Sequence, residues 1–253
     1  MSILKSLVRK AIPVHFIACC KRLRQLREEI LKRDRTAEQI STEIYKGNLW
    51  GGARGDFCSG DGTANQQIGS TYINMVRKMA ESEFFFGLTF VDLGCGDFRV
   101  GERLLSLCSI YKGIDIVEPL ISKNSEKYGN STPQFQQLNI VNDELPNGEV
   151  VFLRQVLQHL SNGQICSILP KLKRCKWVFI TKHYPTDNSS IIPNIDQCMG
   201  GGVRVYKNSG VYLSKPPFDL PKQTLIKALE ALGCGLGKNI DPGVIRTFLY
   251  KPI

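Results

Sequence analysis

The chain has 253 residues, of which 42% are hydrophobic and 22% are charged, and these proportions exclude a mainly disordered chain and a collagen-like repeat. Its formal net charge is +10, from 33 Lys and Arg residues against 23 Asp and Glu residues. Residues 1–35 hold ten of the basic and three of the acidic side chains, so +7 belongs to this segment and only +3 to the rest. An anionic partner is therefore expected for the N-terminal segment and not for the body of the chain.

The N-terminal segment has the pattern of a basic amphipathic helical arm, which we place at residues 1–45. Apolar side chains recur at helical spacing from Ile3 to Ala11, with basic side chains between them. The longest apolar stretch is too short for a bilayer-spanning helix, which needs about 20 residues, and no signal-peptide cleavage site follows it. We predict either peripheral contact with a membrane surface or packing of the apolar stripe on the protein's own domain. Equal sedimentation with anionic liposomes, with and without residues 1–35, would exclude the membrane contact.

The nine cysteines include no Cys-x-x-Cys pair, so the sequence predicts no metal site. Scattered cysteines without an export signal are typical of reduced proteins. We therefore predict a cytoplasmic location, at the inner face of the membrane if the arm binds there. No feature of the sequence indicates an oligomeric state.

The rest of the chain, 46–253, is predicted to be one domain that starts with a glycine-rich loop at 47–63 and a helix at 66–82. Strands are expected at 88–93, 111–116, 135–138, 150–153, 177–181 and 244–250. Helices are expected at 100–107, 119–127, 162–173 and 222–232. Strands separated by helices of about ten residues favour a parallel sheet covered on both faces. The proline-rich segment 185–222 interrupts this order and is predicted to be an insertion that covers the functional site.

The most informative stretch is Val91-Asp92-Leu93-Gly94-Cys95-Gly96-Asp97-Phe98, a strand that runs into a Gly-x-Gly turn. Glycine permits a tight turn and lets a ligand approach the backbone where a Cβ would clash. The second strand ends in Gly113-Ile114-Asp115, and a carboxylate at this position can accept hydrogen bonds from both hydroxyls of a ribose. The sequence therefore predicts a nucleotide-like ligand at the carboxyl ends of the first two strands.

The residues after Gly96 distinguish between nucleotide-like ligands. A dinucleotide fingerprint has a third glycine where this chain has Arg99, and the carboxylate of Asp97 lies in the same region. A carboxylate is unfavourable beside a pyrophosphate and favourable beside a cationic amino acid. S-adenosyl-L-methionine, whose ammonium and sulfonium groups are positive, is therefore the better candidate.

In Val91-Asp92-Leu93-Gly94-Cys95-Gly96 and Gly113-Ile114-Asp115 the sequence resembles the class I S-adenosylmethionine-dependent methyltransferases, over roughly 45–253. It is most similar to a bacterial subgroup associated with surface-polysaccharide genes. That subgroup's pattern is matched by Trp50-Gly51, Ser59-Gly60-Asp61-Gly62, Arg154-Gln155-Val156-Leu157-Gln158-His159-Leu160-Ser161 and Pro216-Pro217-Phe218-Asp219-Leu220-Pro221. The resemblance implies a Rossmann-like, seven-stranded, mostly parallel sheet with helices on both faces, and S-adenosyl-L-methionine as the cofactor.

The resemblance also implies which residues surround the methionine and ribose parts of the cofactor. Gly94 and Gly96 would border the methionine part. Asp92 or Asp97 would face its ammonium group, and Asp115 would hold the ribose.

At the other end of the cofactor, Ile116 would flank the adenine and Asn139 would lie near the adenine amine. Gln155, which follows the fourth strand, would also contact the cofactor. For Asn139 the alternative is an amide that only supports a turn.

A hydroxyl acceptor has to lose a proton, so a general base is expected. The candidates, in order, are His183, His159 and Asp97. For His183 the alternative is a surface histidine in a loop, and for His159 it is a buried histidine hydrogen-bonded to a neighbouring loop. The residues expected on the acceptor side are Trp50, Tyr184, Asn194, Asp196 and Arg204.

We therefore expect a methyltransferase that O-methylates a sugar, a glycan or another small hydroxyl-bearing acceptor. One alternative is an RNA methyltransferase whose basic arm binds phosphates, but the nearly neutral body of the chain and the lack of an Asn-Pro-Pro-Tyr-like word after the fourth strand argue against it. The other is a non-catalytic binding module of the same fold. An intact Gly94-x-Gly96 turn and Asp115 argue against that module.

Overall fold

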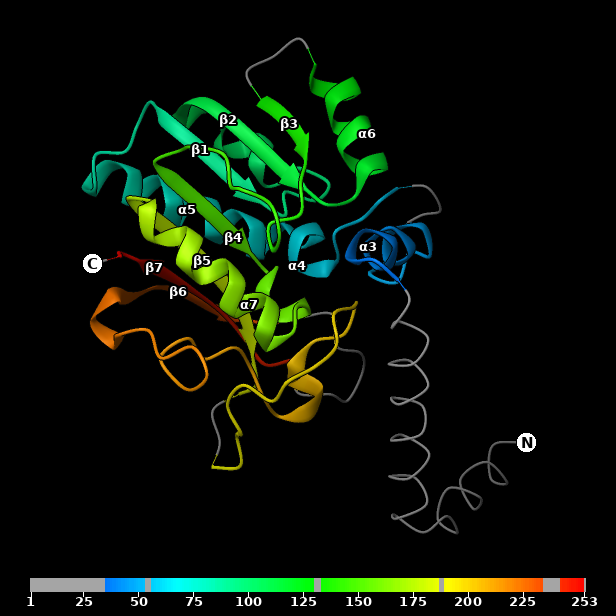
Figure 1. Ribbon diagram of the computed structural model, residues 1–253. Coiled ribbons are helices and arrows are strands. Elements are labelled where there is room, and N and C mark those ends of the chain that lie inside the picture. Colours follow the sequence, from blue (N-terminus) through cyan, green and yellow to red (C-terminus); the bar gives the residue numbers. More distant parts are fainter. Residues whose placement is uncertain (1–34, 53–55, 130–132, 187–188, 234–241, 253) are drawn as a thin grey trace.

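The computed structural model describes residues 35–52, 56–129, 133–186, 189–233 and 242–252 (Figure 1). The helices predicted for the arm before residue 35 lie outside the described residues. Within these ranges, no helix is long and apolar enough to cross a bilayer.

A seven-stranded sheet forms the centre of the molecule, with the strand order β3-β2-β1-β4-β5-β7-β6 (Figure 1). The strands are β1 Leu88–Leu93, β2 Cys108–Asp115, β3 Pro133–Gln137, β4 Val150–Arg154, β5 Trp177–Tyr184, β6 Leu225–Leu232 and β7 Val244–Tyr250. The first five strands pair in parallel, and β7 runs antiparallel to both β5 and β6. The predicted Rossmann-like, mostly parallel sheet is therefore confirmed, and each of the six expected strands forms.

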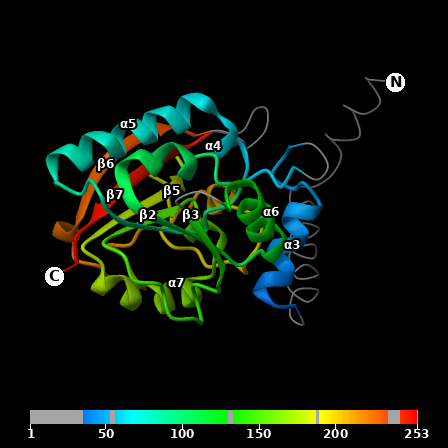
Figure 2. The ribbon, with the colours of Figure 1, turned by 90° about the horizontal axis from the view of Figure 1, so that it is seen from above.

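Helices cover both faces of this sheet (Figure 2). One face carries α5 Gln66–Ser82 and the 3-10 helix η1 Gly101–Leu107, and the other carries α7 Asn162–Ile168 and the 3-10 helix η3 Leu169–Arg174. The helix α6 Glu118–Tyr128 packs against β2 and β3. The sheet thus has the two covering layers that a parallel sheet requires.

Local sequence explains why these elements form. All eight residues of β5 are buried, and β4 is buried along its apolar residues, as expected for central strands covered on both faces. The side chain of Asn65 caps α5, because its Oδ1 accepts hydrogen bonds from the backbone N–H groups of Gln67 and Ile68. The apolar face of α5 then packs on the aromatic core between the helix and the sheet.

The prediction of a helix at 222–232 is wrong. The chain forms a short 3-10 helix, η5 Lys222–Thr224, and then the edge strand β6, which pairs with β7 in antiparallel register from Leu225 to Leu232. The sequence Leu-Ile-Lys-Ala-Leu-Glu-Ala-Leu has high helix propensity, but a free β7 edge offers a row of backbone hydrogen bonds that outweighs it. This segment supplies the seventh strand that the strand patterns did not reveal.

Two other expected helices form wholly or partly as 3-10 helix. The segment 101–107 forms a 3-10 helix, and the helix predicted at 162–173 ends as α-helix at Ile168 and continues as 3-10. Pro170 stands at the start of the 3-10 part, and its missing N–H explains the change.

Candidate active site

The turn after β1 depends on two glycines in the left-handed region. Gly94 has φ +85° and Gly96 has φ +57°. A Cβ on Gly94 would lie 2.4 Å from Val156 Cγ2, and one on Gly96 would lie 2.2 Å from Ser59 Oγ. The backbone N–H groups of Gly94 and Cys95 both donate to the carbonyl of Ile114, at 2.7 and 2.9 Å. The turn is thereby held against the end of β2, and both of its glycines line a cavity.

Asp115 ends β2 beside this turn and is 7% exposed. Its carboxylate accepts hydrogen bonds from the backbone N–H of Gly96 at 3.1 Å and from that of Val117 at 3.1 Å. Burial raises the pKa of Asp115, and these two N–H groups oppose the rise. The side chain lines the cavity, so a buried carboxylate is held in one orientation at the position where the sequence predicts a ribose.

Asp92 lies one strand away, near the end of β1, and also lines the cavity. Tyr111 donates its hydroxyl to Asp92 Oδ2 at 2.9 Å. Burial raises the pKa of Asp92 to about 6, although the Tyr111 hydrogen bond and the nearby Arg154 guanidinium lower it. Arg154 itself donates to Thr63 Oγ1 at 3.0 Å and to the carbonyl of Gly62, so it connects the end of β4 to the segment that covers the cavity.

The cavity has a volume of about 160 Å³ and lies at the carboxyl ends of β1, β2 and β4. Gly94, Gly96, Asp92, Asp115, Ile116 and Asn139 line it from the sheet edge, together with Gln155 and His159 after β4. The opposite wall comes from the helix α3 Ala37–Lys46, from Trp50 and from Met199 of the insertion. The structure therefore brings together seven of the eight residues predicted to contact the cofactor.

The exception is Asp97, which does not line the cavity. Its Oδ2 accepts the backbone N–H of Ser59 at 3.0 Å, and its own N–H donates to Ser59 Oγ at 2.8 Å. Arg99 also forms an ion pair with it, with 3.5 Å between Nε and Oδ2. Asp97 thus fastens the covering loop to the glycine turn, which leaves Asp92 as the carboxylate that can face a cationic group.

Gln155 occupies a strained position directly after β4. It has φ +59°, and its backbone N–H donates to the carbonyl of Thr181 at 2.8 Å. Among the described residues, its buried Nε2 has no hydrogen-bond acceptor. The amide of Asn139, by contrast, supports a turn, since its Oδ1 accepts the N–H of Val141 at 3.0 Å.

His159 lines the cavity next to Trp50. Their ring centroids are 4.9 Å apart, and Nδ1 of His159 lies 3.2 Å from the carbonyl oxygen of Gly202. Burial lowers the pKa of His159 to about 4, so the imidazole is neutral at neutral pH. Trp50 is held in turn by its indole N–H, which donates to the carbonyl of Gly201 at 3.1 Å.

The structure does not bring His183 and Tyr184 to the cavity. His183 Nε2 lies 2.7 Å from the carbonyl oxygen of Pro242, and its backbone N–H donates to Gln158 Oε1 at 2.8 Å. The Tyr184 hydroxyl donates to the carbonyl of Val211 at 3.0 Å. Both side chains lie near the end of β5, which extends three residues further than predicted and pairs with β7 there. His183 and Tyr184 thus lie apart from the cavity that most of the other predicted residues line.

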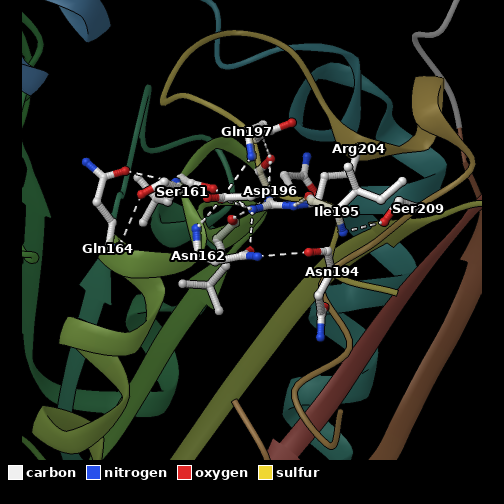
Figure 3. Close-up of polar contacts among 12 residues, drawn as sticks. Ser161, Asn162, Gln164, Asn194, Ile195, Asp196, Gln197, Arg204 and Ser209 are labelled. Carbon is white, nitrogen blue, oxygen red and sulfur yellow. Dashed lines mark hydrogen bonds and ion pairs between the residues drawn. The ribbon is translucent and has the colours of Figure 1, made fainter. Parts of the chain in front are cut away.

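Three further residues of the expected acceptor side instead organise the insertion (Figure 3). Arg204 is 1% exposed and donates to the carbonyls of Ile195 at 2.9 Å and Leu160 at 2.8 Å, with further bonds to neighbouring carbonyls. Asn194 donates to the carbonyl of Pro216 at 2.7 Å and accepts the N–H of Tyr212 at 2.7 Å.

The third residue, Asp196, accepts the backbone N–H of Asn162 at 2.7 Å, at the start of α7. It also forms an ion pair with Arg204, with 4.0 Å between Oδ1 of Asp196 and Nη2 of Arg204. Asp196 and Arg204 thus attach the insertion to η2 Leu157–His159 and α7, whereas the Asn194 side chain joins two parts of the insertion. None of the three lines the cavity. Their spacing in the sequence could not show this, because their partners lie up to 47 residues away.

Sequence reasoning missed the wall formed by α3. Ala37, Ser41 and Tyr45 recur every fourth residue and so share one helical face, and all three line the cavity. The Tyr45 hydroxyl lies 3.1 Å from Ser59 Oγ, in the same group of contacts as Asp97. Thr36 and Gln39 form a capping box that signals the start of this helix, but not the surface on which it packs.

No protein-family model and no curated protein matches the sequence. Among solved structures, the N-methyltransferase NodS from Bradyrhizobium japonicum WM9, in complex with S-adenosyl-L-homocysteine, aligns with a TM-score of 0.56 and 12% identity over 83% of this chain and 98% of NodS. A second similar structure is the magnesium protoporphyrin IX methyltransferase ChlM from Synechocystis PCC 6803, with bound S-adenosyl-L-homocysteine. It aligns with a TM-score of 0.53 and 12% identity, over 86% of this chain and 100% of ChlM. The chain therefore has the fold of the class I S-adenosylmethionine-dependent methyltransferases.

Proposed function

We propose that this protein is an S-adenosyl-L-methionine-dependent methyltransferase that O-methylates a sugar or another small hydroxyl-bearing acceptor. The observation that carries the proposal is the cavity at the carboxyl edge of the sheet, where a glycine turn lies beside the buried carboxylates of Asp92 and Asp115. Ligands of doubly wound sheets bind at this edge. The fold shared with NodS and ChlM supports the methyltransferase part of this proposal.

The residues present fit the cofactor. Asp115 would accept hydrogen bonds from the ribose hydroxyls, and Asp92 would face the ammonium group of the methionine part. At Gly94 and Gly96 a Cβ would collide with the side chains of Val156 and Ser59, so the turn can form this part of the cavity wall only with glycine. The buried Nε2 of Gln155, which has no acceptor among the described residues, is a donor available to the ligand.

Ile116 and Asn139 line the same cavity beside the end of β3 and would border the adenine. When bound, the cofactor supplies a methyl group that its sulfonium has already activated. The protein then has to align the acceptor, exclude water and receive the proton that the acceptor loses.

His159 is the best placed of the three expected bases. It lines the cavity, whereas His183 and Asp97 do not. The carbonyl of Gly202 can only accept, so Nδ1 carries the proton of the neutral ring and Nε2 is left with a lone pair. We propose that Nε2 takes the proton of the acceptor hydroxyl while Trp50 packs against the acceptor.

Isothermal calorimetry with S-adenosyl-L-homocysteine tests the cofactor assignment. The change Asp115→Asn should weaken binding by about 10- to 100-fold, because a hydrogen bond to a charged group contributes roughly 1.5–3 kcal/mol. The control Glu126→Gln alters an exposed carboxylate of the neighbouring α6 and should leave the affinity unchanged. Absence of binding at millimolar ligand by the unaltered protein would favour a non-catalytic module.

Labelled cofactor with a panel of glycan, small-molecule and RNA acceptors tests the acceptor class. Methylation of RNA alone would refute the sugar assignment and support the RNA alternative. Once an acceptor is labelled, His159→Gln should lower kcat by about 10²- to 10⁴-fold and leave the affinity for S-adenosyl-L-homocysteine within about twofold. The matched change His183→Gln should keep most of the activity. If His183→Gln lowered kcat strongly and His159→Gln did not, His183 would be the base instead.

A further inference from the structure

Three consecutive glycines of the insertion contact Trp50 and His159, two residues that line the cavity. The backbone N–H of Gly200 donates to the carbonyl of His159 at 3.1 Å. The carbonyl of Gly201 accepts the indole N–H of Trp50 at 3.1 Å. The carbonyl of Gly202 lies 3.2 Å from Nδ1 of His159. We refer to Gly200–Gly202 as the glycine strap.

The strap contact defines the protonation pattern of the imidazole. A carbonyl oxygen has no proton to give, so the Nδ1–Gly202 hydrogen bond exists in the neutral ring only when Nδ1 is protonated. Nε2 is then an acceptor. The side-chain amide Nε2 of Gln158, which is a donor, lies 3.5 Å from His159 Nε2 and is compatible with the same tautomer.

The strap is held in place from both sides. Before it, Gln197 Nε2 donates to the carbonyl of Gln158 at 2.7 Å. After it, the buried guanidinium of Arg204 donates to the carbonyl of Leu160 at 2.8 Å. The residues that organise the insertion thereby fix the strap against the 3-10 helix that carries His159.

Glycine at position 201 lets the strap lie close to its neighbours. A Cβ at this position would meet Trp50 Nε1 at 3.4 Å and Ile44 Cγ1 at 3.6 Å, which are ordinary contact distances. We expect the methyl groups of a branched side chain, which extend beyond this Cβ, to press on Trp50 and displace the strap. A displaced strap would carry the carbonyl of Gly202 with it. His159 could then place its proton on either nitrogen.

We propose that the glycine strap is the positioning element of the catalytic base: it holds His159 in the Nδ1–H tautomer with Nε2 available to the acceptor, and it does so together with the Trp50 indole. The catalytic consequence rests on the proposed function, in which Nε2 accepts the hydroxyl proton. The tautomer itself does not, because it follows from contacts within the chain.

Nitrogen-15 NMR of the full-length protein, labelled at histidine, tests the tautomer without any acceptor. The chain has three histidines, so His159→Gln and His183→Gln suffice to assign the His159 signals. At neutral pH the expected spectrum shows a protonated Nδ1 and an unprotonated Nε2 for His159. A protonated Nε2 in the unaltered protein would overturn the proposal.

Two variants test the strap. Gly201→Val and Trp50→Phe should each shift the His159 signals toward the other tautomer. The matched controls Gly163→Val, at an exposed glycine of α7, and Trp177→Phe, at the second tryptophan, should not shift them. Unchanged His159 signals in both strap variants would overturn the proposal, and if Gly201→Val does not fold, Trp50→Phe decides alone.

Kinetics separate this inference from the proposed function. Gly201→Val should lower kcat by about tenfold or more and leave the affinity for S-adenosyl-L-homocysteine unchanged, because the strap acts on the base and not on the cofactor. If the unaltered protein showed the expected tautomer but did not bind S-adenosyl-L-homocysteine, the proposed function would be refuted. The inference that the strap sets the tautomer of His159 would still hold. A shifted tautomer with unchanged kcat would overturn the role of the strap in catalysis.

Discussion

Two buried carboxylates at neighbouring strand ends differ in the hydrogen bonds they receive. Asp115 accepts two backbone N–H groups, which fix its orientation. Asp92 accepts one phenol hydroxyl, from Tyr111, and has its pKa raised to about 6 by burial. A carboxylate of this kind is protonated in mildly acidic solution, so its charge can be removed without unfolding the protein.

Cofactor affinity should therefore depend on pH through Asp92. A cationic ammonium group binds the ionised carboxylate better, so the affinity for S-adenosyl-L-homocysteine should fall as the pH drops from 7 through about 6. In Asp92→Asn the affinity should be lower at pH 7 and nearly flat over this range. Calorimetry at several pH values measures the affinity of the unaltered protein and of the variant. If the affinity of the variant depended on pH as steeply, the titration would belong to another group.

At the scale of elements, α3 belongs to the cavity and not only to the arm. The predicted boundary at 45 falls inside this helix, whose face of Ala37, Ser41 and Tyr45 lines the cavity. We propose that the catalytic unit starts near residue 35 and that the arm proper ends before it. The capping box at Thr36 marks a natural beginning for the helix.

Two truncations test this boundary. Removal of residues 1–34 should leave the affinity for S-adenosyl-L-homocysteine within about twofold, because the described cavity lies outside the deleted segment. Removal of residues 1–46 deletes one wall and should weaken binding by about tenfold or more. Calorimetry on both proteins, with circular dichroism as a control for folding, measures the difference. Equal affinity after the two deletions would contradict the role of α3.

At the scale of the whole molecule, a buried lysine opposes folding near neutral pH. Lys182 is 1% exposed, and its Nζ lies 5.4 Å from the ring centroid of Tyr184 and 5.2 Å from that of Phe248. Burial lowers its pKa to about 7. Unfolding returns the amine to water, where it is protonated up to its ordinary value of 10.5.

Stability should therefore rise with pH because of Lys182. Between about pH 7 and 10.5 the unfolded chain binds a proton that the folded chain does not, so this residue adds about 1.4 kcal/mol to the free energy of unfolding for each pH unit. Below pH 7 its penalty is constant and largest. Lys182→Met should be more stable than the unaltered protein at pH 7, and the difference should shrink toward pH 10. Urea unfolding at pH 7, 8.5 and 10 measures it, and a pH-independent difference would contradict the prediction.

The parts of the fold that the sequence determined are those with local causes. The glycine turn of Gly94 and Gly96 lies between a strand and the residues that follow it, and parallel strands bring Asp92 and Asp115 to one edge. Positions of this kind follow from residue type and strand order. The alternation of strands with helices along the chain likewise predicted the parallel part of the sheet.

Only the tertiary structure decided which polar residues reach the cavity. His159 lines the cavity and His183 does not, and three of the carbonyls that accept from Arg204 belong to residues more than 40 positions earlier. The segment from Leu225 to Leu232 forms a strand because β7 offers it a partner, in spite of its helical pattern. The physical reason is the same in each case: a buried polar group or an open strand edge takes the partner that lies next to it in space, and that partner is distant in the chain.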